Sequence, residues 1–370
     1  MKFAHPIKRL ILDILWSRPQ QKLGRLINAS LRTWIFVLVV IVFPLIWLQP
    51  SQPASAQTQQ PEDPIPDTLP NPLDDPLPEH TKNLISAWRP PLYPVPWALS
   101  ENDHFYFVRP VAADEVNWPL SSYRYGGIFF SPDAPHTGVD IVVGEGTPVY
   151  AAGPGQIVWA GTGLLFGDDN NDDPYGLAVA IEHDFGWDNK PLYTLYAHLS
   201  KILINKGDYV KTGDLIALSG ATGMVTAPHL HFEVRVGTNN YYETLNPELW
   251  LAPPQGWGVI VGRLTDGIGE PLLEQEVILT NMETGREWRG KSYGSIFTVN
   301  GDPFYNENFA ISDLPAGRYR IQIPYYGYMY QNFITVKPGM ISYFRYRGLS
   351  GFADFYPSHQ PPSNLPGSID

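Results

Sequence analysis

The sequence predicts a mainly β protein, with an antiparallel sheet in its first domain and a small β-sandwich after it. Hydrophobic residues make up 44% of the 370 residues and aromatic residues 13%, whereas only 17% are charged. The 37 prolines and 33 glycines supply frequent turns, and the apolar segments between them are short. Short strands separated by turns favour antiparallel pairing, because parallel pairs need long crossover connections. For a chain of this length we expect about two domains.

The first 56 residues predict an export signal. They carry seven Lys and Arg against the single acid Asp13, and they lead into the apolar segment 33–48 and the small-residue sequence Ala54-Ser55-Ala56. The apolar segment is short for a full membrane span and contains Pro44. We expect residues 1–56 to be a cleaved signal peptide or an uncleaved N-terminal membrane anchor. Either one makes the remainder extracytoplasmic, whether secreted, periplasmic or associated with the cell wall.

The charge of the remaining chain argues against a nucleic-acid partner. Because the first 56 residues hold seven of the 25 Lys and Arg but one of the 37 Asp and Glu, residues 57–370 have a formal charge of −18. Binding to phosphates would need a basic surface. The Pro-rich acidic segment 57–82 predicts an extended linker. The aromatic segment 83–118 predicts a lead-in that packs on the domain after it.

Residues 119–254 predict an antiparallel β domain. The predicted strands are short apolar or alternating runs separated by Gly, Asp and Pro: GVDIVV, TPVYAA, GQIVWAG, GLAVAIEH, PLYTLYAHL, DYVKTG, DLIALSG and HLHFEVRV. The acidic run 168–173 interrupts this pattern. It lacks the spacing of a dedicated calcium-binding loop, so a solvated insertion is the favoured interpretation and a calcium site the alternative.

Residues 255–347 predict a second, smaller β domain. About seven short strands within roughly 90 residues are typical of a small β-sandwich. The tyrosine-rich segment 324–333 offers rings that can stack on sugars, but sheet core and surface is the favoured interpretation. Residues 348–370 form a Pro-rich tail.

The run HLHFEVRV carries the most specific chemistry. Read as a strand, it alternates polar with apolar side chains, so His229 and His231 share one face with Glu233 and Arg235. Two imidazoles held side by side can act as metal ligands or proton carriers. An isolated pair of this kind is equally compatible with two surface histidines.

Three residues upstream extend this set. His136 and Asp140 lie four apart around Gly138, which allows the backbone to bend, and His198 ends the run PLYTLYAH. Because the chain has no cysteine, histidine and carboxylate must bind any metal. Catalytic zinc takes three such ligands and leaves one position for water. The five candidates exceed that need by two, which leaves two imidazoles for proton transfer. His183 is expected to be an ordinary turn histidine.

Residues 119–251 resemble the lysostaphin/LytM-type zinc metallopeptidases, which cut the peptide cross-links of bacterial peptidoglycan. The matching segments, in the order of that family, are HTGVDI, GTPVYAAGPGQIVWAG, YTLYAHLS, KGDYVKTGDLIALSGATG, APHLHFEVR and LNPELWL. The resemblance implies the duplicated hybrid motif fold, with Zn²⁺ held by His136, Asp140 and His231. It also implies catalytic roles for His198 and His229. Leu177 departs from the family pattern, in which Asn is usual.

The sequence therefore predicts an exported zinc-dependent endopeptidase that hydrolyses peptidoglycan cross-links with a zinc-activated water. The alternative is a catalytically inactive module of the same fold that binds the wall or regulates another enzyme. Such modules usually lack one of the five residues, and none is missing here. The C-terminal domain more loosely resembles prealbumin-like (Ig-like) or carboxypeptidase-regulatory-like sandwiches. That resemblance implies a spacer, or a module that binds wall carbohydrate or protein.

Overall fold

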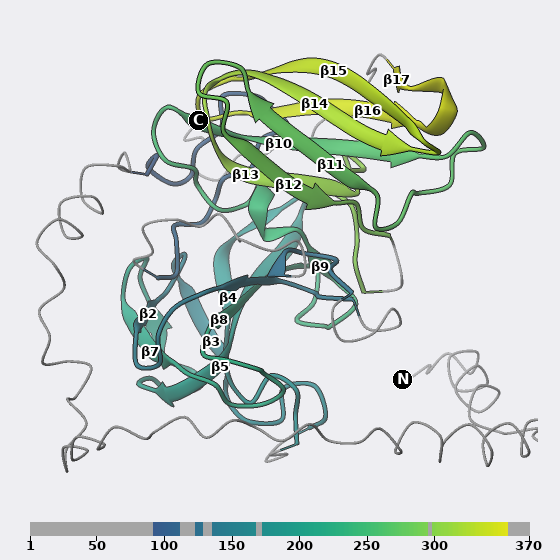
Figure 1. Ribbon diagram of the computed structural model, residues 1–370. Coiled ribbons are helices and arrows are strands. Elements are labelled where there is room, and N and C mark those ends of the chain that lie inside the picture. Colours follow the sequence, from purple (N-terminus) through teal and green to yellow (C-terminus); the bar gives the residue numbers. More distant parts are fainter. Residues whose placement is uncertain (1–91, 112–122, 129–134, 168–171, 295–297, 354–370) are drawn as a thin grey trace, which may run out of the picture. The chain divides into compact units, whose positions relative to one another are not determined.

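The computed structural model describes residues 92–111, 123–128, 135–167, 172–294 and 298–353 (Figure 1). The predicted export segment, the Pro-rich linker, most of the C-terminal tail and residues 168–171 of the acidic insertion lie outside the described residues. No helix in the described ranges is both long and apolar enough to cross a membrane.

The first β domain is a nine-stranded sheet in which every pairing is antiparallel, as the sequence predicted. Its central order is β1-β8-β5-β4-β3-β6, while β2 pairs with β7, β7 with β5, and β9 with β8. The strands are β1 (Val139–Ile141), β2 (Pro148–Tyr150), β3 (Gly155–Gly161), β4 (Leu177–Trp187), β5 (Lys190–Ile202), β6 (Tyr209–Val210), β7 (Leu215–Ser219), β8 (Leu230–Val236) and β9 (Thr244–Leu245).

Strand β8 is the centre of this domain. It lies between β1 and β5, with Asp140 opposite His231 on one side and Ala197 opposite His231 on the other. Its apolar side chains, such as Phe232, are fully buried in the main core. All seven residues of β8 are buried, including the polar ones. The side chains of the polar face therefore need hydrogen-bond partners inside the protein.

The second β domain consists of two four-stranded sheets, in the orders β13-β10-β16-β17 and β12-β11-β14-β15. A separate core of buried aliphatic and aromatic side chains contains residues from both sheets. The pairing of β10 with β16 is parallel, whereas the other pairings are antiparallel. The strands are β10 (Trp257–Thr265), β11 (Glu276–Asn281), β12 (Glu287–Lys291), β13 (Phe309–Pro315), β14 (Gly317–Tyr325), β15 (Tyr328–Val336), β16 (Ile341–Arg347) and β17 (Phe352–Ala353).

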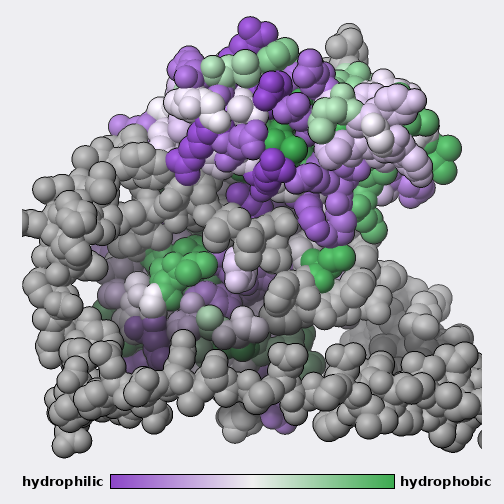
Figure 2. Space-filling view, viewed as in Figure 1, coloured by the Kyte–Doolittle hydropathy of each residue, from purple (hydrophilic) through white to green (hydrophobic). Residues whose placement is uncertain are grey.

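The outward face of the sheet that contains β12 and β15 is largely hydrophilic (Figure 2). On β12 the side chains alternate, so that Glu287, Arg289 and Lys291 are exposed while Trp288 is buried. The sandwich was predicted from the number and spacing of its short strands, and the alternation in β12 fits a strand with one buried face. Its likeness to prealbumin-like domains stays a prediction.

Residues 92–111 contact both β domains. Phe107 pairs with Leu251 of the first domain, and the indole nitrogen of Trp97 donates to the carbonyl of Gly339 in the second. The main core contains Phe105 and Phe107 together with Val259 and Ile341 of the sandwich. The lead-in was expected to pack on the first domain; residues 92–111 contact that domain, and the main core they share with it also includes part of the sandwich.

Candidate metal centre and catalytic residues

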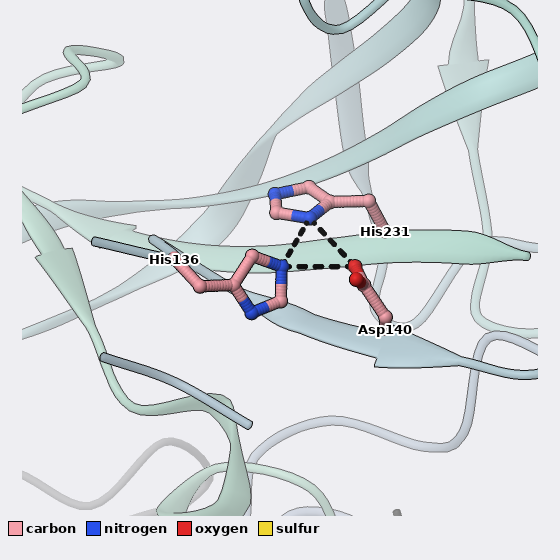
Figure 3. Close-up of side chains that lie close together, drawn as sticks. All are labelled: His136, Asp140 and His231. Atoms are coloured by element: carbon pink, nitrogen blue, oxygen red, sulfur yellow. Dashed lines mark hydrogen bonds and ion pairs between the residues drawn. The ribbon is translucent and has the colours of Figure 1, made fainter. Parts of the chain in front are cut away.

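Three side chains of the first domain converge on one point. Nε2 of His136 lies 2.9 Å from Oδ1 of Asp140 and 2.9 Å from Nδ1 of His231. The third distance, from Nδ1 of His231 to Oδ1 of Asp140, is 3.0 Å. Figure 3 shows the two rings and the carboxylate facing one another, with His231 on β8 and Asp140 on β1. Among the described residues, these are the only three His, Asp or Glu side chains that lie close enough together to hold a metal ion.

The donor set fits a divalent metal. Nδ1 of His136 lies 3.0 Å from the carbonyl oxygen of Arg124, so its proton is directed there and Nε2 keeps a lone pair. Nε2 of His231 likewise faces a carboxylate, that of Glu233, which leaves the lone pair of Nδ1 facing Asp140. Three acceptors this close repel one another unless a cation or proton lies between them. In tetrahedral zinc sites, ligand atoms lie about 3.3 Å apart, a few tenths of an ångström more than here.

The contacts within the cluster also shift the pKa values of its members. Burial alone would raise the pKa of Asp140, but the neighbouring His136 and His231 outweigh it and hold that pKa well below its usual range. Burial alone would lower the pKa of His231, but hydrogen bonds to Asp140 and Glu233 raise it to about 9. The cluster thus attracts a proton to the position that a metal ion would take, and metal binding would release it.

A buried hydrogen-bond network orients His231. Nε2 of His231 lies 2.9 Å from Oε1 of Glu233, and that oxygen also accepts from the hydroxyls of Thr137 and Tyr175, both at 2.6 Å. The other oxygen of Glu233 accepts from Nε of Arg235 at 2.7 Å. Such partners fix the tautomer and the orientation of a metal-binding imidazole. The alternation of HLHFEVRV placed Glu233 and Arg235 on the correct face, but no sequence pattern pointed to Thr137 or Tyr175.

His198 and His229 lie beside the cluster. Their ring centroids are 4.7 Å apart, and Nε2 of His229 is 3.5 Å from Oδ1 of Asp140. Each ring is oriented through Nδ1, which lies 2.9 Å from the carbonyl of Thr222 in His198 and 2.8 Å from that of Ala227 in His229. Each neutral ring therefore has its acceptor nitrogen, Nε2, on the other side of the ring.

The surroundings keep both rings neutral. Burial, followed by the nearby His231 and His229, lowers the pKa of His198 to about 3. Burial also lowers the pKa of His229. His198 further adopts φ +60°, a left-handed conformation that is uncommon for a residue with a side chain and is enriched at functional sites.

All five predicted site residues line one pocket of about 320 Å³. Its walls are otherwise largely apolar, and Val142, Leu165 and Met224 are exposed at it. None of the described residues that line it is Lys or Arg. The pocket thus combines a metal-ligand cluster and two neutral imidazoles with apolar walls, an arrangement suited to hydrolysis of an uncharged bond.

Two expectations about neighbouring residues need correction, and one gains a second reason. His183 is not a turn residue: it lies within β4 and is buried, with Nε2 2.9 Å from Oγ1 of Thr194, and burial lowers its pKa to about 4. Gly138 does lie at a bend, as expected, and it is also required for close approach to β8, because a Cβ there would lie 2.4 Å from the carbonyl oxygen of Phe232. Asp173, at the end of the acidic run, is buried and accepts from the backbone N–H groups of Leu165 and Phe166. It is a structural residue of its loop.

Comparison with known proteins agrees with this geometry. Residues 134–245 match the model of the family described as Peptidase family M23. The chain is 44% identical over 119 residues to the peptidoglycan DD-endopeptidase ShyB of Vibrio cholerae serotype O1, covering 32% of this chain and 24% of that protein. It is 38% identical over 172 residues to lysostaphin of Staphylococcus simulans, covering 46% of this chain and 28% of that protein.

Among solved structures, the chain matches the catalytic domain of lysostaphin from Staphylococcus simulans with 36% identity and a TM-score of 0.28, over 34% of this chain and 86% of that one. The chain spans about a quarter of the length of the curated relatives ShyB and lysostaphin. The family match covers the segment that carries all five site residues. Residues 134–245 of this chain therefore form a domain of peptidase family M23.

Proposed function

We propose that this chain is an exported zinc-dependent endopeptidase that hydrolyses peptide cross-links of bacterial peptidoglycan. The observation that carries the proposal is that His136, Asp140, His198, His229 and His231 line one pocket of an M23 domain. The relative ShyB bears the name of a peptidoglycan DD-endopeptidase, which supports the choice of substrate.

In this proposal His136, Asp140 and His231 hold the metal, and His198 and His229 act on the substrate. Bound zinc would polarise the scissile carbonyl and lower the pKa of the attacking water. One of the two neutral rings, His198 or His229, would accept the proton of that water at Nε2, because Nδ1 of each ring is committed to a backbone carbonyl. A ring protonated in this way can stabilise the charge that develops on the carbonyl oxygen and then protonate the leaving amine.

The pocket supports a peptide substrate with small or apolar side chains. Its exposed apolar residues can cover such groups, and a substrate carboxylate would find no Lys or Arg among the described residues that line the pocket. Because the chain covers only part of its named relatives, the bond that is cut has to be determined on this protein.

Export and wall attachment are parts of the same proposal. The basic and apolar segment 1–56 supports export, by a cleaved signal peptide or as a membrane anchor. Two tyrosines of the C-terminal sandwich, Tyr326 (78% exposed) and Tyr328 (67% exposed), supply ring faces for contact with wall carbohydrate.

The test uses purified protein that has been stripped of metal with a chelator and then reloaded with zinc. Both forms are incubated with purified peptidoglycan, and the soluble fragments are analysed by mass spectrometry. We expect fragments with new amino termini from the reloaded form alone, and their masses identify the bond. Binding to peptidoglycan without fragments from the zinc-loaded protein would instead support the inactive wall-binding module.

A further inference from the structure

The backbone segment that precedes the metal cluster is attached to a neighbouring loop. The N–H of His136 donates to the carbonyl of Gly127, and the carbonyl of His136 accepts from the N–H of Gly126, both at 2.7 Å. Nδ1 of the same residue lies 3.0 Å from the carbonyl of Arg124. The orientation of the His136 ring therefore depends on where residues 124–127 lie.

The side chain of Arg124 is tied to the C-terminal sandwich through Glu248. Nη1 of Arg124 lies 2.5 Å from Oε2 of Glu248, a carboxylate that is fully buried. The same oxygen accepts from the backbone N–H of Ser312 at 2.8 Å and from its hydroxyl at 2.9 Å. Ser312 belongs to β13 of the sandwich. Removing one partner of a buried ion pair is costly, so this contact holds Arg124 firmly.

Tyr125 and Gly126 contact the sandwich directly. The hydroxyl of Tyr125 donates to the carbonyl of Thr244 and accepts from the backbone N–H of Asn300, both at 2.8 Å. The ring of Tyr293 lies edge-on to that of Tyr125, with centroids 5.4 Å apart. Gly126 has φ +77°, and a Cβ there would lie 2.2 Å from Cβ of Tyr293. Only glycine permits this approach.

We propose that the C-terminal sandwich positions the metal ligand His136, and that Tyr293, Asn300 and Ser312 are the positioning residues. These residues contribute no ligand, but they hold residues 124–127, which hold both the backbone and the ring of His136. A metal site needs its ligands within about 0.5 Å of the productive geometry, and their supporting contacts set its affinity. The sandwich is thus part of the metal centre's support, which adds to the proposed function and rests only on its metal-binding part.

The test measures zinc affinity in the full chain by competition with a chromophoric chelator, without substrate. Tyr293→Ala removes the packing against Tyr125 and Gly126. The matched control is Tyr346→Ala, another buried tyrosine, whose ring packs against Tyr330 and Phe352 within the sandwich. We expect Tyr293→Ala to raise the zinc dissociation constant about tenfold or more and to alter the absorption spectrum of the cobalt-substituted protein. The control should lower the melting temperature with a less than twofold change in zinc affinity.

A milder variant covers the case in which Tyr293→Ala does not fold. Tyr125→Phe keeps the ring and removes only the hydroxyl that meets Asn300 and Thr244, and we expect a several-fold weaker zinc site. Unchanged zinc affinity and an unchanged cobalt spectrum in the folded variants would overturn the proposal, as would an equal loss of affinity in Tyr346→Ala. Zinc affinity and the cobalt spectrum are both measured without substrate. This test can therefore succeed or fail independently of whether the protein releases fragments from peptidoglycan.

Discussion

Nε2 of His231 lies 2.9 Å from Oε1 of Glu233, while Nδ1 on the other side of the same ring faces Asp140 at 3.0 Å. Glu233 is fully buried, and burial alone would raise its pKa. Its contacts with Arg235 and His231 outweigh that effect and hold the pKa well below its usual range. The carboxylate is therefore ionised and keeps the proton of His231 on Nε2, so that Nδ1 is free for a metal.

Replacing Glu233 should weaken the metal site without removing a ligand. In Glu233→Gln the amide can accept from His231 but also brings an N–H₂ group against Arg235, so the ring is less well held. We expect a zinc dissociation constant roughly 10-fold higher, measured by chelator competition. Glu182→Gln, at an exposed position of β4, is the control and should leave the affinity unchanged. Equal affinities in both variants would show that Glu233 does not support the ligand.

The ligand and proton-transfer roles can be separated by substitution. His231→Ala should abolish both zinc binding and fragment release, because the ion loses one of three protein ligands. His198→Ala and His229→Ala should keep stoichiometric zinc, while the rate of fragment release falls by roughly 10²–10⁴. Zinc content is measured by elemental analysis and the rate by chromatography of soluble fragments. Loss of zinc from His198→Ala, or full activity in either variant, would contradict these assignments.

Wall binding by the sandwich can be tested apart from catalysis. The double variant Tyr326→Ser/Tyr328→Ser removes two exposed rings at the β14–β15 turn. We expect it to bind purified peptidoglycan with about tenfold lower affinity, measured by co-sedimentation. Ile268→Ser, at a residue that is 88% exposed in another loop, is the control for lost apolar surface. Zinc affinity should be the same in all three proteins. If both variants bind as well as the unchanged protein, the tyrosines have no part in attachment.

The sequence was informative wherever one segment contains the whole signal. Alternation in HLHFEVRV set the strand and put His231, Glu233 and Arg235 on one face, and Gly and Pro marked the turns between strands. Strand β5 and the strands of the sandwich were predicted for the same reason. These patterns are local, so they do not depend on which strands become neighbours.

What the sequence did not reveal depends on contacts between distant segments. Thr137 and Tyr175 meet Glu233 across the sheet, and a hydroxyl next to a carboxylate leaves no periodic pattern. Both faces of β8 are buried, which depends on the segments that pack against each face and which alternation cannot specify. The attachment of Arg124 to Ser312 through Glu248 likewise arises only when the two domains pack together.

A buried carboxyl group in the shared core makes the stability of the fold depend on pH. Asp103 accepts hydrogen bonds from the hydroxyl of Tyr305 at 2.9 Å and from the N–H of Ile341 at 3.4 Å. Burial raises its pKa from 3.8 to about 7. Between about pH 4 and pH 7 the unfolded chain ionises this group and the folded protein does not. The stability it contributes is therefore fully present below pH 4 and is lost as the pH rises to about 7.

The free energy of unfolding should accordingly fall by at most about 4 kcal/mol over this interval on account of Asp103. Asp103→Asn keeps the acceptor oxygen but cannot ionise, so it removes this dependence. Burial also raises the pKa of Glu307, to about 8, so the unchanged protein and the variant share its contribution, and their difference isolates Asp103. Urea unfolding from pH 5 to pH 8 should show the variant gaining stability relative to the unchanged protein as the pH rises. Parallel curves would mean that Asp103 is ionised in the folded protein throughout.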